Sequence, residues 1–188
     1  MIRLIQIELK KILSYRAFWL LAGFYAISLT FTLIVAQVII NKILVEAGKS
    51  APIPLLKISL YQFPRIWNNL TYMAGFLTLF LAIIVIFLVC NEFSNKTIRQ
   101  NIINGLSRKE FVLSKLYFIL IISLAATLLI LILGLILGLI HTKNPDIGDI
   151  FNSRLQFIPG YFVEVLTYLI FAFFIAFLLK KTGLAVIT

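Results

Sequence analysis

The sequence contains one cysteine, Cys90, and one histidine, His141. A single thiol cannot form an internal disulfide or a thiolate metal cluster, so we expect Cys90 to pack as a small apolar residue. There is no Cys–His pair to supply the nucleophile and base of thiol catalysis. Asp146 and Asp149 follow His141, but their spacing matches no known metal-ligand set, so we expect a solvated loop there. These absences argue against a metal or thiol enzyme.

Charge is also scarce. Charged residues make up 13% of the sequence and hydrophobic residues 62%, whereas a soluble domain has about 25% and about 45–50%. A water-soluble fold of this size could not bury so much apolar surface, but lipid can accept it. The net charge of +10 comes from basic residues placed between apolar runs, as membrane topology requires. We therefore expect lipid, and no nucleic acid, as a partner.

Four apolar runs are long enough to cross about 30 Å of hydrocarbon, which takes roughly 20 helical residues. They predict spans over residues 17–40, 71–90, 116–140 and 161–179. Because the runs are continuously apolar and do not alternate as barrel strands do, the predicted fold class is all-α, a polytopic transmembrane helical bundle. A further apolar run begins at Gly183, and we expect residues 183–188 to start a fifth span that continues beyond Thr188.

Basic residues predict the orientation, because cytoplasmic loops are enriched in Lys and Arg. Residues 1–16, 91–115 and those after 179 hold eleven of the 17 Lys and Arg residues. The N-terminus is therefore predicted to be cytoplasmic, in a multi-pass protein of the inner (cytoplasmic) membrane. Residues 1–16 have apolar residues at helical spacing, which indicates an amphipathic arm in the headgroup layer. A simple extension of the first span is the alternative.

The cytoplasmic loop 91–115 has the local chemistry of two short helical pieces. Ser94 or Asn95 can cap the first piece, and Asn104-Gly105 suits a left-handed helix stop. Ser107 and Glu110 have the spacing of a capping box, which predicts the start of the helix that leads into the third span. A compact basic helix over residues 95–104 is expected to cross the cytoplasmic face.

This loop resembles that of permeases of the ABC type-2 exporter family. In that family a Glu, often followed by Phe, ends the second span, and a Thr with a basic residue, a break, a Ser-Arg pair and a Lys follow. The matching positions are Glu92, Phe93, Thr97, Arg99, Gly105, Ser107, Arg108 and Lys115. Lys96 departs from the pattern, because a Gly commonly precedes the Thr, and Gly105-Leu106 replaces a frequent Pro. The resemblance covers residues 91–115 in motif and the whole chain in layout.

The resemblance implies a six-span permease subunit that pairs with a second copy or a paralogue and with ABC ATPase subunits. The chain has no G-x-x-x-x-G-K-[ST] loop, so ATP and Mg would be bound by the partner ATPase, with no cofactor and no enzymatic site in this chain. Residues 95–104 would press on the ATPase. Glu92, with Arg99 or Lys96, would help to fix that helix; the alternative is a charged rim without a specific partner.

Two features within the predicted spans remain. Glu164 is an ionisable residue about one turn inside the outer boundary, which makes it a candidate for the substrate path, with an interfacial role as the alternative. Gly134 and Gly138 form G-x-x-x-G, which permits close helix approach, either within the subunit or at a dimer seam. The rival functions are a membrane-embedded enzyme and a membrane anchor or sensor, with the active part beyond residue 188.

Overall fold

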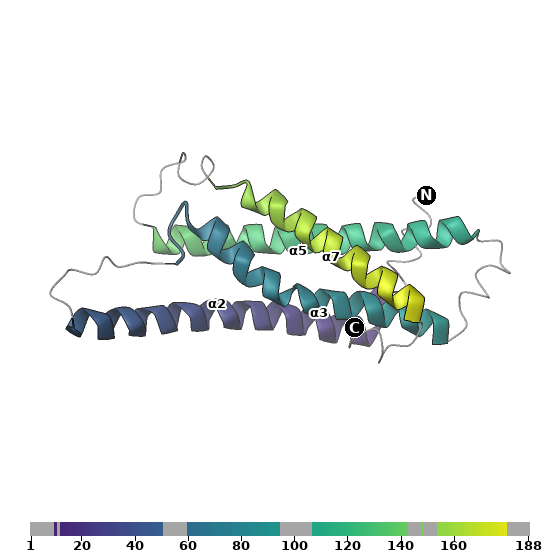
Figure 1. Ribbon diagram of the computed structural model, residues 1–188, viewed down its shortest axis with the longest axis horizontal. Helices are drawn as coiled ribbons and strands as arrows, with labels where there is room; N and C mark the ends of the chain where they lie inside the picture. The colour runs from purple at the N-terminus through teal and green to yellow at the C-terminus, as the bar shows by residue number, and fades with distance from the viewer. Residues whose placement is uncertain are drawn as a thin grey trace.

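The computed structural model describes residues 10, 12–50, 60–94, 107–142, 148 and 154–179. These contain four long helices: α2 (Arg16–Ser50), α3 (Ile66–Ser94), α5 (Arg108–His141) and α7 (Phe157–Leu179). Successive helices run in opposite directions (Figure 1). Within the described ranges there is no strand, so the all-α prediction is confirmed.

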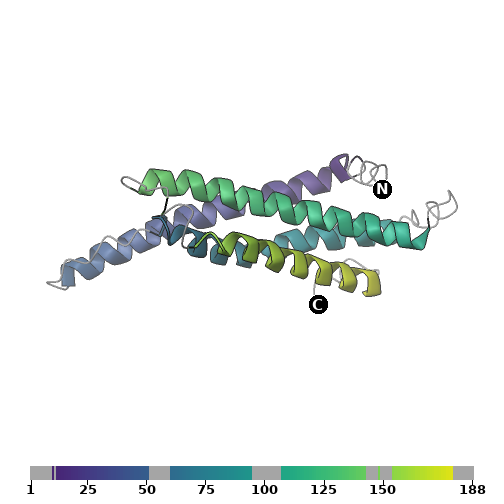
Figure 2. The same cartoon turned by 90° about the horizontal axis from the view of Figure 1, so that it is seen from above.

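The alternation gives the bundle two ends. At the proximal end α2 and α5 begin and α3 and α7 end, and at the distal end α2 and α5 end and α3 and α7 begin (Figure 1). The last turns of α2 extend beyond the other helices at the distal end (Figure 2). The proximal end is the one at which the loop between α3 and α5 joins the bundle.

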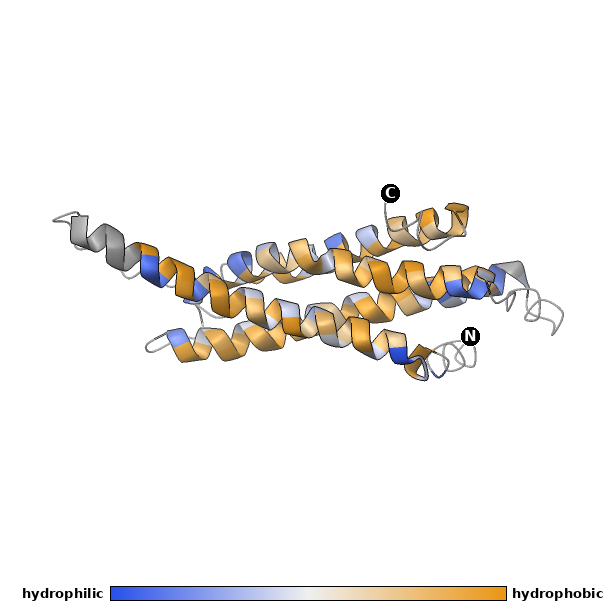
Figure 3. Cartoon of the chain, turned by 90° about the horizontal axis from the view of Figure 1, so that it is seen from below, coloured by the Kyte–Doolittle hydropathy of each residue, from blue (hydrophilic) through white to orange (hydrophobic). Residues whose placement is uncertain are grey.

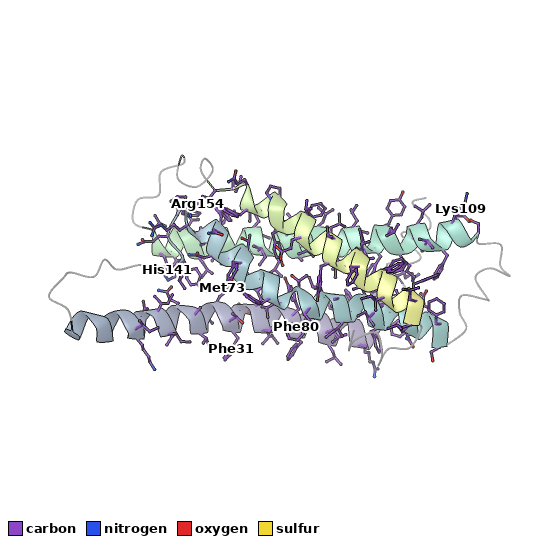
Figure 4. The ribbon with its side chains drawn as sticks, viewed as in Figure 1. Phe31, Met73, Phe80, Lys109, His141 and Arg154 are labelled. Carbon is purple, nitrogen blue, oxygen red and sulfur yellow. The ribbon has the colours of Figure 1, made fainter. Side chains whose placement is uncertain are left out.

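All four helices are long and apolar enough to cross a membrane. The shortest, α7, has 23 residues and is about 34 Å long at 1.5 Å per residue, which exceeds the hydrocarbon thickness of about 30 Å. Apolar residues fill the middle of the bundle and polar ones lie toward its two ends (Figure 3). The labelled Lys109 lies at the proximal end, and His141 and Arg154 lie at the distal end (Figure 4).

Each helix contains its predicted span but begins earlier or ends later. The second, third and fourth helices start at Ile66, Arg108 and Phe157, where the apolar runs predict starts at residues 71, 116 and 161. Hydropathy locates where a helix enters lipid, whereas backbone hydrogen bonds continue the helix into the polar layer.

Helix α3 is the centre of the bundle. It packs against α2, α5 and α7, and α5 also packs against α7. By contrast, α2 presents a large apolar outer face: Phe31, 66% exposed, lies on the side of α2 away from the other helices (Figure 4). Leu20, Phe24 and Ile27 are exposed on the same helix. Such a continuous exposed apolar face suits contact with lipid or another membrane helix.

The two glycines of the G-x-x-x-G spacing are covered by aromatic rings of the same chain. A Cβ atom at Gly134 would lie 2.6 Å from the Trp67 ring, and one at Gly138 would lie 2.3 Å from the Phe63 ring. Phe63 and Trp67 are themselves buried. The glycines therefore allow α5 to pack closely within the subunit, and the dimer-seam alternative does not describe their use here.

Candidate functional site

The candidate site is built where α3 ends and α5 begins, on both sides of the predicted coupling segment. Lys115 Nζ donates to Glu92 Oε1 at 2.6 Å, and the two side chains are 3% and 7% exposed. Glu92 lies in the last turn of α3 and Lys115 in the second turn of α5. The ion pair therefore joins the two helices that flank residues 95–106.

The ion pair has an aromatic neighbour. Phe111, which is itself buried, lies with its ring centroid 5.4 Å from Lys115 Nζ, within range of a cation–π interaction. Two charges removed from water lose several kcal/mol of hydration each, so a buried pair persists only with good geometry. The short contact and the aromatic neighbour supply it. The pair is thus a rigid link between α3 and α5.

The start of α5 is fixed by a second device, which the sequence predicted. Ser107 Oγ accepts a hydrogen bond from the Glu110 backbone N–H at 3.2 Å, and the Ser107 N–H donates to Glu110 Oε2 at 2.9 Å. This is the capping box expected from the S-x-x-E spacing, and it is confirmed. The chain therefore enters α5 at a defined residue, directly after the predicted coupling segment.

Other contacts connect this end of α3 to the rest of the bundle. Phe93 packs edge-to-face on Phe177 of α7, with ring centroids 5.4 Å apart. Asn91 Nδ2 donates to the hydroxyl of Tyr15, just before α2, at 2.9 Å. The last turn of α3 thus contacts α5, α7 and the residues that precede α2. A displacement of this turn would therefore change its contacts with α5, with α7 and with the residues that precede α2.

Several predicted site residues lie outside the described residues. These are Lys96, Thr97 and Arg99, together with Gly105, the side chain of Arg108, residues 1–9 of the arm and residues 183–188 of the expected fifth span. The prediction that Glu92, with Arg99 or Lys96, helps to fix the coupling helix stays a prediction, and the structure shows Glu92 paired with Lys115. Lys115 itself was selected from the sequence, but its contact with Glu92 was not. The sequence feature that could have predicted this contact is the position of Glu92 and Lys115, two residues of opposite charge at the adjoining ends of consecutive apolar runs.

The structure places Glu164 on α7, and its depth in a membrane stays a prediction. Glu164 lies two turns, or about 10 Å, after Phe157, the first residue of the helix. Its side chain is exposed, and its Oε1 lies 3.1 Å from where a Cβ atom at Gly75 would be. No salt bridge links it to a basic residue in the described part of the chain. The carboxyl group therefore faces the surroundings of the bundle, beside α3.

The position of an exposed Glu164 within an apolar helix leads to a stability prediction. A carboxylate at mid-membrane costs about 2.5–3.5 kcal/mol on insertion scales, and less nearer the interface, so replacing Glu164 with Gln is expected to raise the midpoint of thermal unfolding in lipid nanodiscs. Glu110→Gln is the matched control, because Gln retains a capping box and Glu110 is exposed at the proximal end. An unchanged or lower midpoint for Glu164→Gln would show that the carboxyl group does not face lipid.

A buried hydroxyl cluster was missed by the sequence analysis. The hydroxyl groups of Tyr25 and Tyr161 are 3.1 Å apart, and the side chain of Thr78 hydrogen-bonds to Tyr161. All three are buried, and they come from α2, α7 and α3. Tyr residues near a span end commonly lie at the membrane interface, whereas these hydroxyl groups link three helices inside the bundle. Their single hydroxyl groups in apolar runs gave no signal of the pairing.

Nothing in the described residues suggests a metal centre. No group of three or more His, Cys, Asp and Glu side chains gathers there, and Asp146 and Asp149 lie outside the described residues. Cys90 is buried, as predicted. At the proximal end, a buried ion pair joins α3 and α5 next to the basic segment 95–104. This arrangement is suited to transmitting a movement and not to chemistry.

Comparison with known proteins gives a family but no activity. No curated protein and no solved structure is similar enough to the chain to count as a match. One family model matches over residues 35–188, which include all of α3, α5 and α7 and the part of α2 from residue 35 onward. The chain therefore belongs to the family described as a protein of unknown function, DUF2705.

Proposed function

We propose that this chain is the permease subunit of an ABC exporter, a multi-pass protein of the inner (cytoplasmic) membrane with its proximal end in the cytoplasm. In this proposal a separate ABC ATPase binds ATP and Mg and hydrolyses the nucleotide. A second permease copy or a paralogue completes a dimer, and each subunit has six spans. The exposed apolar face of α2, which includes Phe24 and Phe31, is available for such a neighbour.

The observation that supports this proposal most is the Glu92–Lys115 ion pair. It joins α3 and α5 at the base of the segment that resembles the coupling region of ABC type-2 permeases. If an ATPase displaces residues 95–104, the displacement is transmitted to both α3 and α5, because these helices are linked at their ends. Packed helices move as rigid units, so the displacement would be passed along the spans. A loop that merely reversed the chain would need no such link.

The proposal predicts contact between the coupling segment and an ATPase. A photo-crosslinking amino acid in place of Gln100 is expected to capture a protein with a phosphate-binding loop from native membranes, identified by mass spectrometry. The matched position is Asn41 of α2, which lies toward the distal end and is expected to capture none. Equal capture from both positions, or a Gln100 product without an ATPase, would contradict the proposal.

The same complex allows a functional measurement. Arg99→Glu is expected to lower the ATP hydrolysis that the permease stimulates in its ATPase several-fold, because it reverses charge in the proposed contact. Lys42→Glu reverses a charge toward the distal end of α2 and is expected to leave the rate unchanged. Equal rates for wild-type and Arg99→Glu complexes would remove the coupling role. Glu164 remains a candidate for the substrate path because it is an exposed ionisable residue of a helix that can cross a membrane.

A further inference from the structure

Helix α2 is attached to the rest of the bundle along one narrow stripe. Of residues 16–43, whose side chains the structure describes, only Tyr25, Leu29 and Leu33 are buried. They are spaced by four residues, so they lie one above another on the same side of the helix and span about 12 Å. By contrast, buried residues occur around the whole of α3. Helix α2 therefore lies at the edge of the bundle and not inside it (Figure 1).

Helix α2 does not pack closely on α5. Among the described helices its extensive contact is with α3, and apolar grooves separate it from α5 at two levels. The distal groove lies between Leu33 of α2 and Leu137 of α5. The groove nearer the proximal end is lined by Ala22 and Ala26 of α2 and by Ala125 of α5. Small residues on both walls permit two helices to approach closely, so α2 has room to move toward α5.

Two tyrosine hydroxyl groups attach the ends of the buried stripe to residues outside α2. The Tyr25 hydroxyl hydrogen-bonds to the Tyr161 hydroxyl of α7 at 3.1 Å. The Tyr61 hydroxyl donates to the Leu33 carbonyl oxygen at 2.5 Å, and the Tyr61 ring packs edge-to-face on His141 of α5, with centroids 5.6 Å apart. Tyr25 and Tyr61 are both buried. Each end of the stripe is therefore fixed by a hydrogen bond to another part of the bundle.

These polar contacts matter because apolar contacts alone select the position of a helix only weakly in a membrane. Lipid tails are as apolar as leucine side chains, so an apolar helix gains little by exchanging lipid for a neighbouring helix. A hydroxyl group that loses its hydrogen bond in an apolar environment is costly by comparison. If α2 moved, the hydroxyl groups of Tyr25 and Tyr61 would lose the hydrogen bonds described above. The two tyrosines thus favour the position of α2 in this structure.

We propose that α2 is a movable helix with a second position, closed onto α5, and that the hydroxyl groups of Tyr25 and Tyr61 hold it in the position described here. The second position lies toward α5 because the small residues of the proximal groove can meet there. On its outer side α2 has exposed apolar residues such as Phe31, and no other described helix packs against them. Helices α3, α5 and α7 pack on one another and stay together. The proposal does not depend on ATP-driven transport.

Distances between spin labels test the proposal on the purified chain in lipid nanodiscs. Cys90→Ala removes the native thiol, and labels are attached at Ile27→Cys of α2 and Leu128→Cys of α5, two positions that are 69% and 56% exposed. The double variant Tyr25→Phe with Tyr61→Phe removes the hydroxyl groups and retains the rings. In this variant the population with a shorter α2–α5 distance is expected to rise several-fold.

Matched variants show whether the movement is the proposed one. Tyr168→Phe removes a hydroxyl group from a residue of α7 that is 41% exposed and is expected to leave the α2–α5 distance unchanged. Ala125→Phe fills the proximal groove from an exposed position and is expected to abolish the shift in the double variant. A second label pair, Leu79→Cys of α3 with Leu128→Cys, is expected to keep its distance throughout.

Three results would overturn the proposal. The first is an unchanged or longer α2–α5 distance in the double variant. The second is an equal change between α3 and α5, which would mean that the whole bundle loosens. The third is a shift that persists when Ala125→Phe fills the groove. Because no ATPase is present, none of these results bears on the exporter function, which the Gln100 crosslink tests by itself.

Discussion

Glu92→Gln is expected to destabilise the bundle by about 3–5 kcal/mol, the usual effect of removing one partner from a buried ion pair. The substitution retains the shape of the side chain but removes the charge that Lys115 Nζ contacts at 2.6 Å. The measurement uses Cys90, the one cysteine of the sequence, which is 1% exposed. Its rate of alkylation in nanodiscs reports opening of the bundle, and the rate is expected to rise at least tenfold.

Two further variants identify the cause. Lys109→Met removes an exposed lysine from the same end of α5 and is expected to leave the alkylation rate unchanged. The double variant Glu92→Leu with Lys115→Met is expected to recover most of the stability, because apolar residues of similar volume commonly replace a buried pair without loss. An alkylation rate for Glu92→Gln that equals the wild-type rate would mean that the pair does not hold the two helices together.

The double variant also separates folding from coupling. If the ion pair serves only to hold α3 against α5, the apolar replacement retains the ATP hydrolysis that the permease stimulates. If the charges themselves position the coupling segment, stimulation falls although Cys90 stays protected. The exporter proposal allows either result for this variant, since it depends on the Gln100 contact and not on which forces join the helices.

Gly138→Ala is expected to destabilise the bundle by about 1–3 kcal/mol, the usual effect of overpacking. The added Cβ atom would lie 2.3 Å from Phe63 Cζ and 2.4 Å from Cε2. The Phe63 ring is 8% exposed and packs against Trp67, with centroids 5.7 Å apart, so both rings must shift. Thermal unfolding and Cys90 alkylation measure the loss.

Gly23→Ala is the matched control for this substitution. Gly23 lies inside α2 and has no other atom within 4 Å of an added Cβ atom. Alanine at such a position reduces the freedom of the unfolded chain, so it is expected to stabilise by about 0.4–1 kcal/mol. The combination Gly138→Ala with Phe63→Leu is expected to recover part of the loss by making room. A neutral Gly138→Ala variant would show that Phe63 does not occupy the glycine surface.

The four helices and the start of α5 could be predicted because their determinants are local. Uninterrupted apolar runs give the spans, and Ser107 with Glu110 gives the helix start, which the structure places there. The other helix ends could not be predicted from hydropathy. A helix can either continue or end at polar residues on a membrane surface, so the end of an apolar run does not locate the end of the helix. The start of α7 at Phe157, four residues before the predicted start at residue 161, is an example.

Contacts between helices were less predictable. Glu92 and Lys115 were each selected from the sequence, but the ion pair between these two residues of different helices was not predicted. Such a contact depends on how α3 and α5 are rotated about their axes. Both helices are apolar on all sides, so their sequences do not indicate which face packs against the neighbouring helix. The glycine spacing predicted a close approach at Gly134 and Gly138, but not that Trp67 and Phe63 would fill it.

The α3–α5 pair is attached at both of its ends, which limits how the protein can move. Charge joins the helices at Lys115, and aromatic rings sit in the notches at Gly134 and Gly138, about 30 Å further along α5. Because the two helices are attached at two points, α3 and α5 cannot slide along each other without breaking at least one of these attachments. Sliding movements within the bundle must therefore occur between the α3–α5 pair and α2 or α7. The α3–α5 pair itself moves as one rigid body.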